Sequence, residues 1–294
     1  MPFQRITILG CGLIGGSFAL ALKQAGFAGE IVGWGREDAL ERARQRGAID
    51  RGVVDLAQAV ADADLVYLST PVGAILDLLP QVGQAAKAGA LVTDAGSTKV
   101  AICARAKEVL PKKVTFLGGH PLTGKETSGI ENADADLFVG AKYVVIKERK
   151  EAEEAEEEFG SESVREFLGW LRRVGAEPVV LDAETHDRAV AFTSHLPQLL
   201  STALAAAVWD ETDRDKLTVS LAASGFRNMV RLASSPYEIW RDICATNSEN
   251  ISRALERLER RLARLRARLR SPELAEEFEK AQQLSQQFRA NAKR

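Results

Sequence analysis

The chain has 294 residues, of which 46% are hydrophobic and 27% are charged, and its formal net charge at pH 7 is −2. This length is sufficient for two domains, and the composition is that of an ordinary globular protein with a substantial core. The nearly balanced charge provides no overall attraction to nucleic acid or to an acidic membrane, so we expect neither as a partner.

The chain starts directly with a predicted strand at residues 5–9, and no basic segment followed by an apolar core precedes it. The sequence also contains no apolar run long enough to cross a membrane. Cys11, Cys103 and Cys244 lie far apart and lack metal-ligand or redox spacing. We therefore expect no metal site, no disulfide framework and a location in the reducing cytoplasm.

A glycine motif follows the first strand. Gly10, Gly12 and Gly15 have the G-x-G-x-x-G spacing and lead into an amphipathic helix. In a dinucleotide-binding fold the first glycine permits a tight turn, the second lets the backbone approach the diphosphate, and the third allows close packing of helix on strand. The free N–H groups at the start of the helix would then face negative charge. The motif in this setting predicts dinucleotide binding.

The end of the second predicted strand, EIVGWGRED, bears on which dinucleotide is bound. An NAD-binding fold usually has an acidic residue here, which binds the ribose 2′-hydroxyl. Gly35 removes the carboxylate that would repel a 2′-phosphate, and Arg36 could bind that phosphate bidentately, so we expect NADP in preference to NAD. In the alternative interpretation Arg36 is solvated, and Glu37 or Asp38 caps the next helix or binds the ribose. The expected cofactor-binding residues are Gly10, Gly12, Leu13, Ile14, Gly15, Arg36, Thr70 and Pro71.

Short β-branched runs alternate with helical patterns as far as residue 181, which is typical of a parallel sheet built from βαβ units. A charged segment at residues 147–163 interrupts this pattern, and we interpret it as a solvated helix or a mobile insertion. We assign residues 1–181 to a Rossmann-type α/β domain that binds a dinucleotide. The strands are expected at residues 5–9, 31–34, 65–69, 91–94, 115–118, 143–147 and 178–181.

Residues 182–294 are expected to form an all-α domain for substrate binding and dimerisation. We predict a turn at residues 223–226, and after it one long terminal helix. The arginines at residues 253–270 are interspersed with glutamates and have no aromatic platform, which argues against nucleic-acid binding. The terminal helix carries a narrow heptad stripe that requires a partner helix, within a bundle or in a homodimer. The stripe consists of Ile251, Leu255, Leu258, Leu262, Leu265 and Leu269.

His120 lies in an unusual stretch, GGHPLTGKETSG, at residues 118–129. The apolar run VTFL precedes it, so His120 should emerge where a strand ends and a loop begins. Ligands bind at that edge of an open α/β sheet. A single histidine is more often structural than catalytic, and further motifs must decide between the two interpretations.

Five motifs together, in chain order, resemble those of the prephenate dehydrogenase family, which includes arogenate dehydrogenases. They are GCGLIGGS, DAGSTK, GGHPLTGKETSG, SHLPQ and GFRNMVRLASSPYEIWRDI, and they extend over nearly the whole chain. The resemblance implies oxidative decarboxylation of prephenate to 4-hydroxyphenylpyruvate on the route to tyrosine. It also implies a dinucleotide-binding domain followed by a helical domain through which two chains pair.

The resemblance assigns catalytic roles to two residues. His120 of GGHP matches the histidine that accepts the proton of the substrate's ring hydroxyl as hydride leaves for the nicotinamide. Ser97 of DAGSTK matches the serine that binds the same region and orients the histidine. The alternative for Ser97 is a helix cap before Thr98. We interpret His186 as structural, because it lies near the start of a helix at the domain boundary.

The resemblance also assigns a substrate-binding group. His195 of SHLP and Arg231 of FRNMVR match residues that hold the substrate's carboxylates, with Arg227 and Trp240 nearby. Fixed arginines suit a dianion such as prephenate. The structural alternatives are a core histidine for His195 and a surface ion pair for Arg231. Ser224 departs from the family pattern, where a glycine is expected, and this leaves the shape of the substrate entrance open.

Three rival functions remain open. Arogenate has an amine where prephenate has a keto group, and the loop at Lys125 and Glu126 does not decide between them. A β-hydroxyacid dehydrogenase of similar layout would favour a lysine as its acid–base group, and the histidines and arginines argue against it. A dimeric dinucleotide sensor without catalysis would have no need for His120, Ser97 and Arg231 together.

Overall fold

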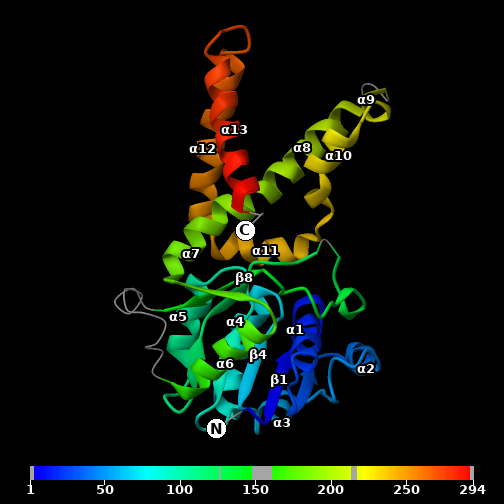
Figure 1. Ribbon diagram of the computed structural model, residues 1–294, viewed down its shortest axis with the longest axis vertical. Helices are drawn as coiled ribbons and strands as arrows, with labels where there is room; N and C mark the ends of the chain where they lie inside the picture. The colour runs from blue at the N-terminus through cyan, green and yellow to red at the C-terminus, as the bar shows by residue number, and fades with distance from the viewer. Residues whose placement is uncertain (1–2, 126, 148–160, 213–216, 292–294) are drawn as a thin grey trace. The chain divides into compact units, whose positions relative to one another are not determined.

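The computed structural model describes residues 3–125, 127–147, 161–212 and 217–291 (Figure 1). The chain forms two compact units, Met1–Ser248 and Glu249–Arg294. Most of the charged segment at residues 147–163, namely 148–160, lies outside the described residues, as does Glu126. Among the described residues, no helix combines the length and the apolar character that a membrane span requires.

A parallel sheet of six strands forms the centre of the first unit, with the order β3-β2-β1-β4-β5-β6. The five strands expected in this region are confirmed to within two residues. Strand β3 is not among the expected strands, because its segment, RGV, is too short and too polar to give a strand signal. The strands are β1 (Arg5–Leu9), β2 (Glu30–Trp34), β3 (Arg51–Val53), β4 (Leu65–Leu68), β5 (Leu91–Asp94) and β6 (Thr115–Leu117).

A second sheet of three strands contains β7 (Gly119–Pro121), β8 (Lys142–Ile146) and β9 (Glu177–Leu181). The expectation of a single βαβ sheet up to residue 181 is therefore wrong, since β7 and β8 are antiparallel and β8 pairs only with β7 and β9 in the described chain. The physical cause is that the chain passes very close to the end of β5 directly after β6. A Cβ atom at Gly119 would lie 2.6 Å from the carbonyl oxygen of Asp94, so only glycine lets the chain pass the end of β5 and enter a new strand.

Helices cover both faces of the six-stranded sheet (Figure 1). On one face Phe18 of α1 stacks on Tyr67 of β4 with ring centroids 4.3 Å apart. On the other face Val66 and Leu68 of the same strand pack against α4 and α5, as the alternation of side chains along a strand requires. The first face carries α1 (Leu13–Gln24), α2 (Glu37–Gln45) and α6 (Glu162–Arg173), and the second carries α3 (Leu56–Val60), α4 (Val72–Ala85) and α5 (Val100–Val109).

The chain is helical after residue 182, as predicted, but two details of the prediction are wrong. The expected turn at residues 223–226 is largely the first turn of α10, and the expected single terminal helix is two helices, α12 and α13. Pro272 lies between them, and proline lacks the N–H group that a continuing helix needs. The helices are α7 (Ala183–Val190), α8 (Leu196–Thr212), α9 (Leu217–Ser220), α10 (Ser224–Met229), α11 (Tyr237–Thr246), α12 (Ser248–Ala267) and α13 (Leu274–Asn291).

Candidate active site

The glycine loop has the geometry that a dinucleotide requires. Gly10 has a φ of 100°, which favours glycine. A Cβ atom at Gly15 would lie 2.3 Å from the Gly10 carbonyl oxygen, so a larger residue would push α1 away from β1. A Cβ atom at Gly12 would meet nothing within 4 Å, which leaves the backbone at the start of α1 open to a ligand. The loop therefore fits a bound diphosphate.

The remaining residues expected at the cofactor lie around the same point of the sheet. The strand order reverses between β1 and β4, and ligands of open α/β sheets bind at such a point. Thr70 and Pro71 lie one residue after the end of β4, and half-buried Leu13 and Ile14 begin α1. The Thr70 hydroxyl oxygen is buried without a hydrogen-bond partner among the described residues, so it is available to a bound group.

The region that would distinguish the two dinucleotides lies at the end of β2. A Cβ atom at Gly35 would meet open space. The Arg36 side chain is 84% exposed, and its Nε lies 3.8 Å from Asp38 Oδ1. A distance of this length is typical of a weak surface ion pair, so the contact with Asp38 does not prevent Arg36 from binding a ligand.

His120 is the central residue of β7 and pairs with Val144 of β8. The expectation that it lies in a loop after a strand is therefore only partly correct, since the loop is a short strand of a second sheet. Its backbone is held by a buried ion pair of Lys99 and Asp94. Lys99 Nζ donates to the Gly119 carbonyl oxygen (2.7 Å), and the Gly119 N–H donates to Asp94 Oδ1 (3.1 Å). This arrangement fixes His120 close to the carboxyl end of β5.

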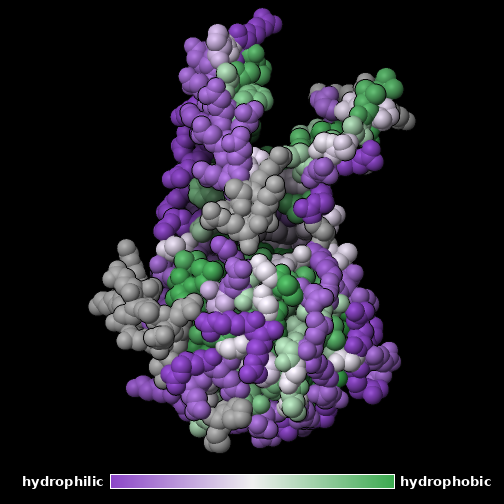
Figure 2. Space-filling view, viewed as in Figure 1, coloured by the Kyte–Doolittle hydropathy of each residue, from purple (hydrophilic) through white to green (hydrophobic). Residues whose placement is uncertain are grey.

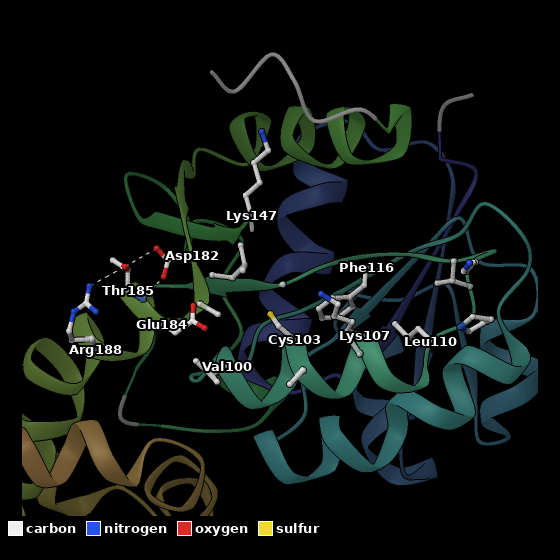
Figure 3. A pocket seen from close by; sticks show the side chains of 18 residues that line it. Val100, Cys103, Lys107, Leu110, Phe116, Lys147, Asp182, Glu184, Thr185 and Arg188 are labelled. Carbon is white, nitrogen blue, oxygen red and sulfur yellow. Dashed lines mark hydrogen bonds between the residues drawn. The ribbon is translucent and has the colours of Figure 1, made fainter. Parts of the chain in front are cut away.

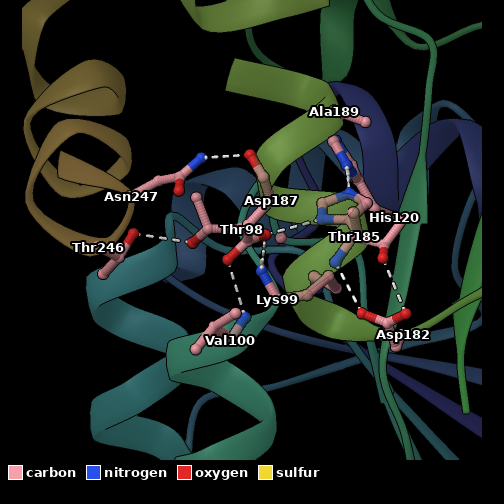
Figure 4. A network of polar contacts seen from close by, with 12 residues as sticks. Thr98, Lys99, Val100, His120, Asp182, Thr185, Asp187, Ala189, Thr246 and Asn247 are labelled. Atoms are coloured by element: carbon pink, nitrogen blue, oxygen red, sulfur yellow. Dashed lines mark hydrogen bonds and ion pairs between the residues drawn. The ribbon is translucent and has the colours of Figure 1, made fainter. Parts of the chain in front are cut away.

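A chain of polar contacts joins His120 to α7 and α5 (Figure 4). The Nδ1 atom of His120 lies 2.8 Å from Nε2 of His186, and Nδ1 of His186 lies 2.7 Å from Oδ1 of Asp187. The Asp187 carboxylate also accepts hydrogen bonds from the backbone N–H groups of Lys99 (2.7 Å) and Val100 (2.9 Å). His186, which was expected to be structural, is therefore in direct contact with the predicted base.

Asp182 sets the position of His186 and Asp187 on α7. Its side chain accepts hydrogen bonds from the backbone N–H and the hydroxyl of Thr185, at 2.7 and 2.8 Å. Such an N-cap stabilises a helix by about 1 kcal/mol and fixes the residue at which it begins. With the start of the helix fixed, His186 faces β7 and Asp187 faces α5. The aspartate N-cap was the signal in the sequence that could have located the start of α7, but it does not reveal the contact of His186 with β7.

His195 is 1% exposed and lies in a π-helical turn (Ala191–His195) between α7 and α8. Such turns are frequent at functional sites. Asn247 Nδ2 lies 3.3 Å from His195 Nδ1 and also donates to the Asp187 carbonyl oxygen at 2.8 Å. The amide therefore donates to Nδ1, and neutral His195 carries its proton on Nε2. That Nε2 atom is buried without a partner among the described residues.

Both histidines favour the neutral form. Burial, together with the nearby His186 and Lys99, lowers the pKa of His120 well below its ordinary value. Burial also lowers the pKa of His195 to about 4. At neutral pH each ring therefore has one nitrogen that donates and one that accepts. A neutral imidazole can take a proton from a substrate, whereas an imidazolium cannot.

Comparison with known proteins shows the family. The family model described as the prephenate dehydrogenase nucleotide-binding domain matches residues 18–161, and the one described as the dimerization domain matches residues 182–284. The chain belongs to the prephenate dehydrogenase family. It is 38% identical, over 87% of its length and 68% of the relative's, to the prephenate dehydrogenase of Lactococcus lactis subsp. cremoris.

Two solved structures resemble the whole chain. Prephenate dehydrogenase of Aquifex aeolicus in complex with hydroxyphenyl propionate and NAD+ has a TM-score of 0.83 and 26% identity, covering 98% of this chain and 99% of that one. Arogenate dehydrogenase of Synechocystis has a TM-score of 0.77 and 29% identity, covering 97% and 99%. The family fold, a nucleotide-binding α/β domain followed by a helical domain, is thus the one that the sequence predicted.

The other expected substrate residues of this family member are distributed over the helical part. Trp240 of α11 lies edge-on to His195, with ring centroids 5.9 Å apart. The neighbouring Asp242 accepts a hydrogen bond from the Gly73 N–H in the first turn of α4 (2.9 Å), which joins α11 to α4. Arg227 lies on α10, and Arg231 begins the 3₁₀ turn Arg231–Ser234; both arginines are exposed.

Ser97 lies half-buried between β5 and α5. No hydrogen bond joins its hydroxyl to His120 in the described part of the chain, where His186 is instead the partner of that ring. The N-cap position of α5 belongs to Lys99, so Ser97 does not cap this helix in the way that the alternative interpretation required. Ser97 thus follows β5 at the carboxyl edge of the sheet, near the loops that carry the glycine motif and His120.

A cavity of about 1030 Å³ lies elsewhere, between α5, β6, β8 and α7 (Figure 3). None of the predicted site residues lines it. Cys103, Lys107, Phe116 and Arg188 are among its lining residues, and Lys147, the last described residue before 148–160, also borders it. Val100, Asp182 and Thr185 of the polar network also line the cavity, whereas His120, His186 and Asp187 do not.

Proposed function

We propose that this chain catalyses the oxidative decarboxylation of prephenate to 4-hydroxyphenylpyruvate with hydride transfer to a nicotinamide dinucleotide. The observation that carries the proposal is the position of His120. A neutral imidazole lies at the edge of the sheet where the glycine loop also lies, in a chain of the prephenate dehydrogenase family. The glycine loop, Leu13, Ile14, Thr70 and Pro71 would hold the cofactor, which supplies the hydride acceptor when bound.

His120 supplies the proton chemistry. The ring carbon that bears the hydroxyl loses its hydrogen with the bonding electron pair, and the hydroxyl proton passes to His120. The bond to the ring carboxylate then breaks, and its electrons complete the aromatic ring as carbon dioxide leaves. The phenolic oxygen takes the proton back from His120. Because aromatisation drives the loss of carbon dioxide, the residues need only accept, hold and return one proton.

His195 is proposed to bind the substrate, with Arg231, Arg227 and Trp240. Its buried Nε2–H group has no partner among the described residues, and an unmet donor of this kind costs free energy until an acceptor binds. A carboxylate of the substrate is such an acceptor. Arg231 and Arg227 would supply the fixed positive charge that a dianion requires. Ser97 is proposed to bind the ring hydroxyl beside His120.

NADP is the proposed preferred cofactor. Gly35 leaves open space where an NAD-binding fold usually has its carboxylate, and exposed Arg36 makes only a long contact with Asp38. Both features favour a 2′-phosphate, since the first removes repulsion and the second offers a cation.

The active form is proposed to be a homodimer, with the domain boundary after residue 181. Residues 182–284 match the dimerization domain of the family. Large apolar side chains gather on the surface of the arm formed by α8, α9 and α10 (Figure 2), and the most exposed are Trp209 (70%), Leu217 (64%), Leu221 (79%) and Met229 (52%). An apolar patch of this kind is typical of an interface.

The test is turnover by the purified chain, followed through the absorbance of the reduced nicotinamide, with prephenate, arogenate and a set of β-hydroxyacids. The proposal expects prephenate to give the highest kcat/KM. A higher value for arogenate would assign the chain to the other activity of its family. Binding of the dinucleotide without any turnover would support the alternative of a sensor.

A further inference from the structure

The carboxylate of Asp187 binds two backbone N–H groups in addition to His186. Its side chain is 1% exposed, and both oxygens accept hydrogen bonds from backbone N–H groups, of Lys99 and Val100. These groups lie at the start of α5, where N–H groups lack partners within the helix and the helix dipole favours negative charge. As an ionised group, Asp187 can only accept further hydrogen bonds.

Because the Asp187 carboxylate only accepts hydrogen bonds, it determines which nitrogen of each imidazole carries the proton. Nδ1 of His186 lies 2.7 Å from the Asp187 carboxylate, so Nδ1 must carry the proton. In its neutral form, His186 has a free electron pair on Nε2, and this atom lies 2.8 Å from Nδ1 of His120. His120 must therefore donate from Nδ1, and its own free electron pair is on Nε2.

We propose that His186 and Asp187 are positioning residues of the reaction, which hold His120 in the tautomer that makes Nε2 the base. The inference rests on the proposed function, because it assigns the base of that reaction to one atom. The O–H bond of the substrate breaks, an Nε2–H bond forms on His120, and the Nδ1–H bond stays in place. The positive charge that His120 then carries is stabilised by the hydrogen bond from its Nδ1 to His186, which the Asp187 carboxylate polarises in turn.

Replacement of the Asp187 carboxylate by an amide distinguishes a positioning role from a merely structural contact. With an amide in place of the Asp187 carboxylate, the side chain can donate as well as accept, so His186 is no longer forced to carry its proton on Nδ1. His120 could then carry its proton on Nε2, where it blocks the base. His195 provides an internal reference, because Asn247 links it to the backbone carbonyl of Asp187 and not to the side chain.

The first measurement is the tautomer of His120 by ¹⁵N NMR of the full-length protein labelled at histidine. The chain has three histidines, so single substitutions assign every signal. We expect Nδ1 to carry the proton in the wild type, and Asp187→Asn to move it wholly or partly to Nε2 while His195 is unchanged. A wild-type His120 protonated on Nε2 near neutral pH overturns the proposal. This result does not depend on which substrate the enzyme uses.

The second measurement is turnover of Asp187→Asn against Asp62→Asn, which makes the same chemical change at a carboxylate that is 75% exposed and ion-paired with Arg5. Asp62 lies outside the network of His120, so Asp62→Asn should keep near wild-type kcat. We expect Asp187→Asn to lower kcat by about 10²-fold or more, the scale of a lost general base, with KM and dinucleotide affinity nearly unchanged. A kcat within about threefold of the control contradicts the proposal.

Substitution of His186 gives a second test if Asp187→Asn does not fold. The side-chain oxygen of glutamine can accept the hydrogen bond from His120 Nδ1, whereas leucine cannot. We expect His186→Gln to retain about tenfold more kcat than His186→Leu at similar thermal stability. Equal kcat in the two variants counts against a positioning role. If the wild type fails to oxidise prephenate at all, the proposed function fails, and the tautomer measurement alone then decides this inference.

Discussion

His120 Nδ1 and His186 Nε2 lie 2.8 Å apart, although the two residues are 66 positions apart in the chain. One belongs to β7 of the second sheet and the other to the first turn and a half of α7. The predicted base therefore takes its orientation from the first helix after the α/β region. If His186 positions the base as proposed, activity requires the packing of α7 against α5 through Asp187 and the N–H groups of Lys99 and Val100.

The first prediction concerns the base itself. We expect His120→Asn to fold and to bind the dinucleotide normally, because the side chain is not among the groups of the glycine loop. Its kcat for prephenate should fall by about 10²- to 10⁴-fold, the usual contribution of a positioned general base. Steady-state kinetics with a fluorescence titration of the reduced dinucleotide measures both. A variant that keeps more than about a tenth of wild-type kcat shows that another group takes the proton.

The second prediction concerns stability at low pH. The pKa of His195 is about 4 in the folded protein against an ordinary value of 6.5, so the unfolded chain binds more protons between these values. Stability is then lost as the pH falls through this window, by about 2 kcal/mol at pH 5 from this residue. Denaturant unfolding at pH 7 and pH 5 measures the loss. His195→Gln, which does not titrate, should lose less stability than the wild type, and equal losses would argue against a depressed pKa.

The glycine loop and His186 show which features of the site could be predicted from the sequence and which could not. Gly10, Gly12 and Gly15 were predictable, because their task is set by backbone sterics within one strand, turn and helix. His186 was interpreted as structural, because its partner in β7 is distant in the chain and becomes visible only when α7 is docked. The second sheet was missed for the same reason. A single close approach, of Gly119 to the Asp94 carbonyl oxygen, redirects the chain, and periodicity carries no trace of it.

The third prediction concerns substrate affinity. Arg231→Ala removes one fixed cation from a site proposed to hold a dianion, so we expect KM for prephenate to rise by about ten- to a hundredfold. The dinucleotide affinity should not change. Arg105→Ala, which removes an exposed arginine paired with Glu108 on α5, is the control and should behave as the wild type. If both variants have the wild-type KM, Arg231 does not belong to the substrate site.

The fourth prediction concerns assembly. Sedimentation at micromolar concentration should give twice the chain mass of 31.9 kDa. We expect Leu221→Glu, at an exposed apolar residue directly after α9, to weaken the dimer, because a charge in an apolar interface loses its hydration. Val54→Glu, at a residue that is 60% exposed beside β3, is the matched control. A wild-type chain that sediments as a monomer contradicts the prediction.

The last prediction is a preference for NADP over NAD, and it depends on Gly35 and Arg36 together. A 2′-phosphate carries nearly two negative charges, so a carboxylate at residue 35 would repel it and an arginine at residue 36 attracts it. The Arg36 side chain is 84% exposed, and water weakens its contribution, so we expect a ratio of kcat/KM of about ten rather than a hundred. The double variant Gly35→Asp/Arg36→Ile should reverse the preference, since a Cβ at residue 35 meets open space and the new carboxylate can reach the ribose. Arg44→Ile, on the same helix and paired with Glu41, should leave the ratio unchanged. If the wild type already prefers NAD, Arg36 is only a surface charge, and Glu37, Asp38 or backbone groups hold the ribose.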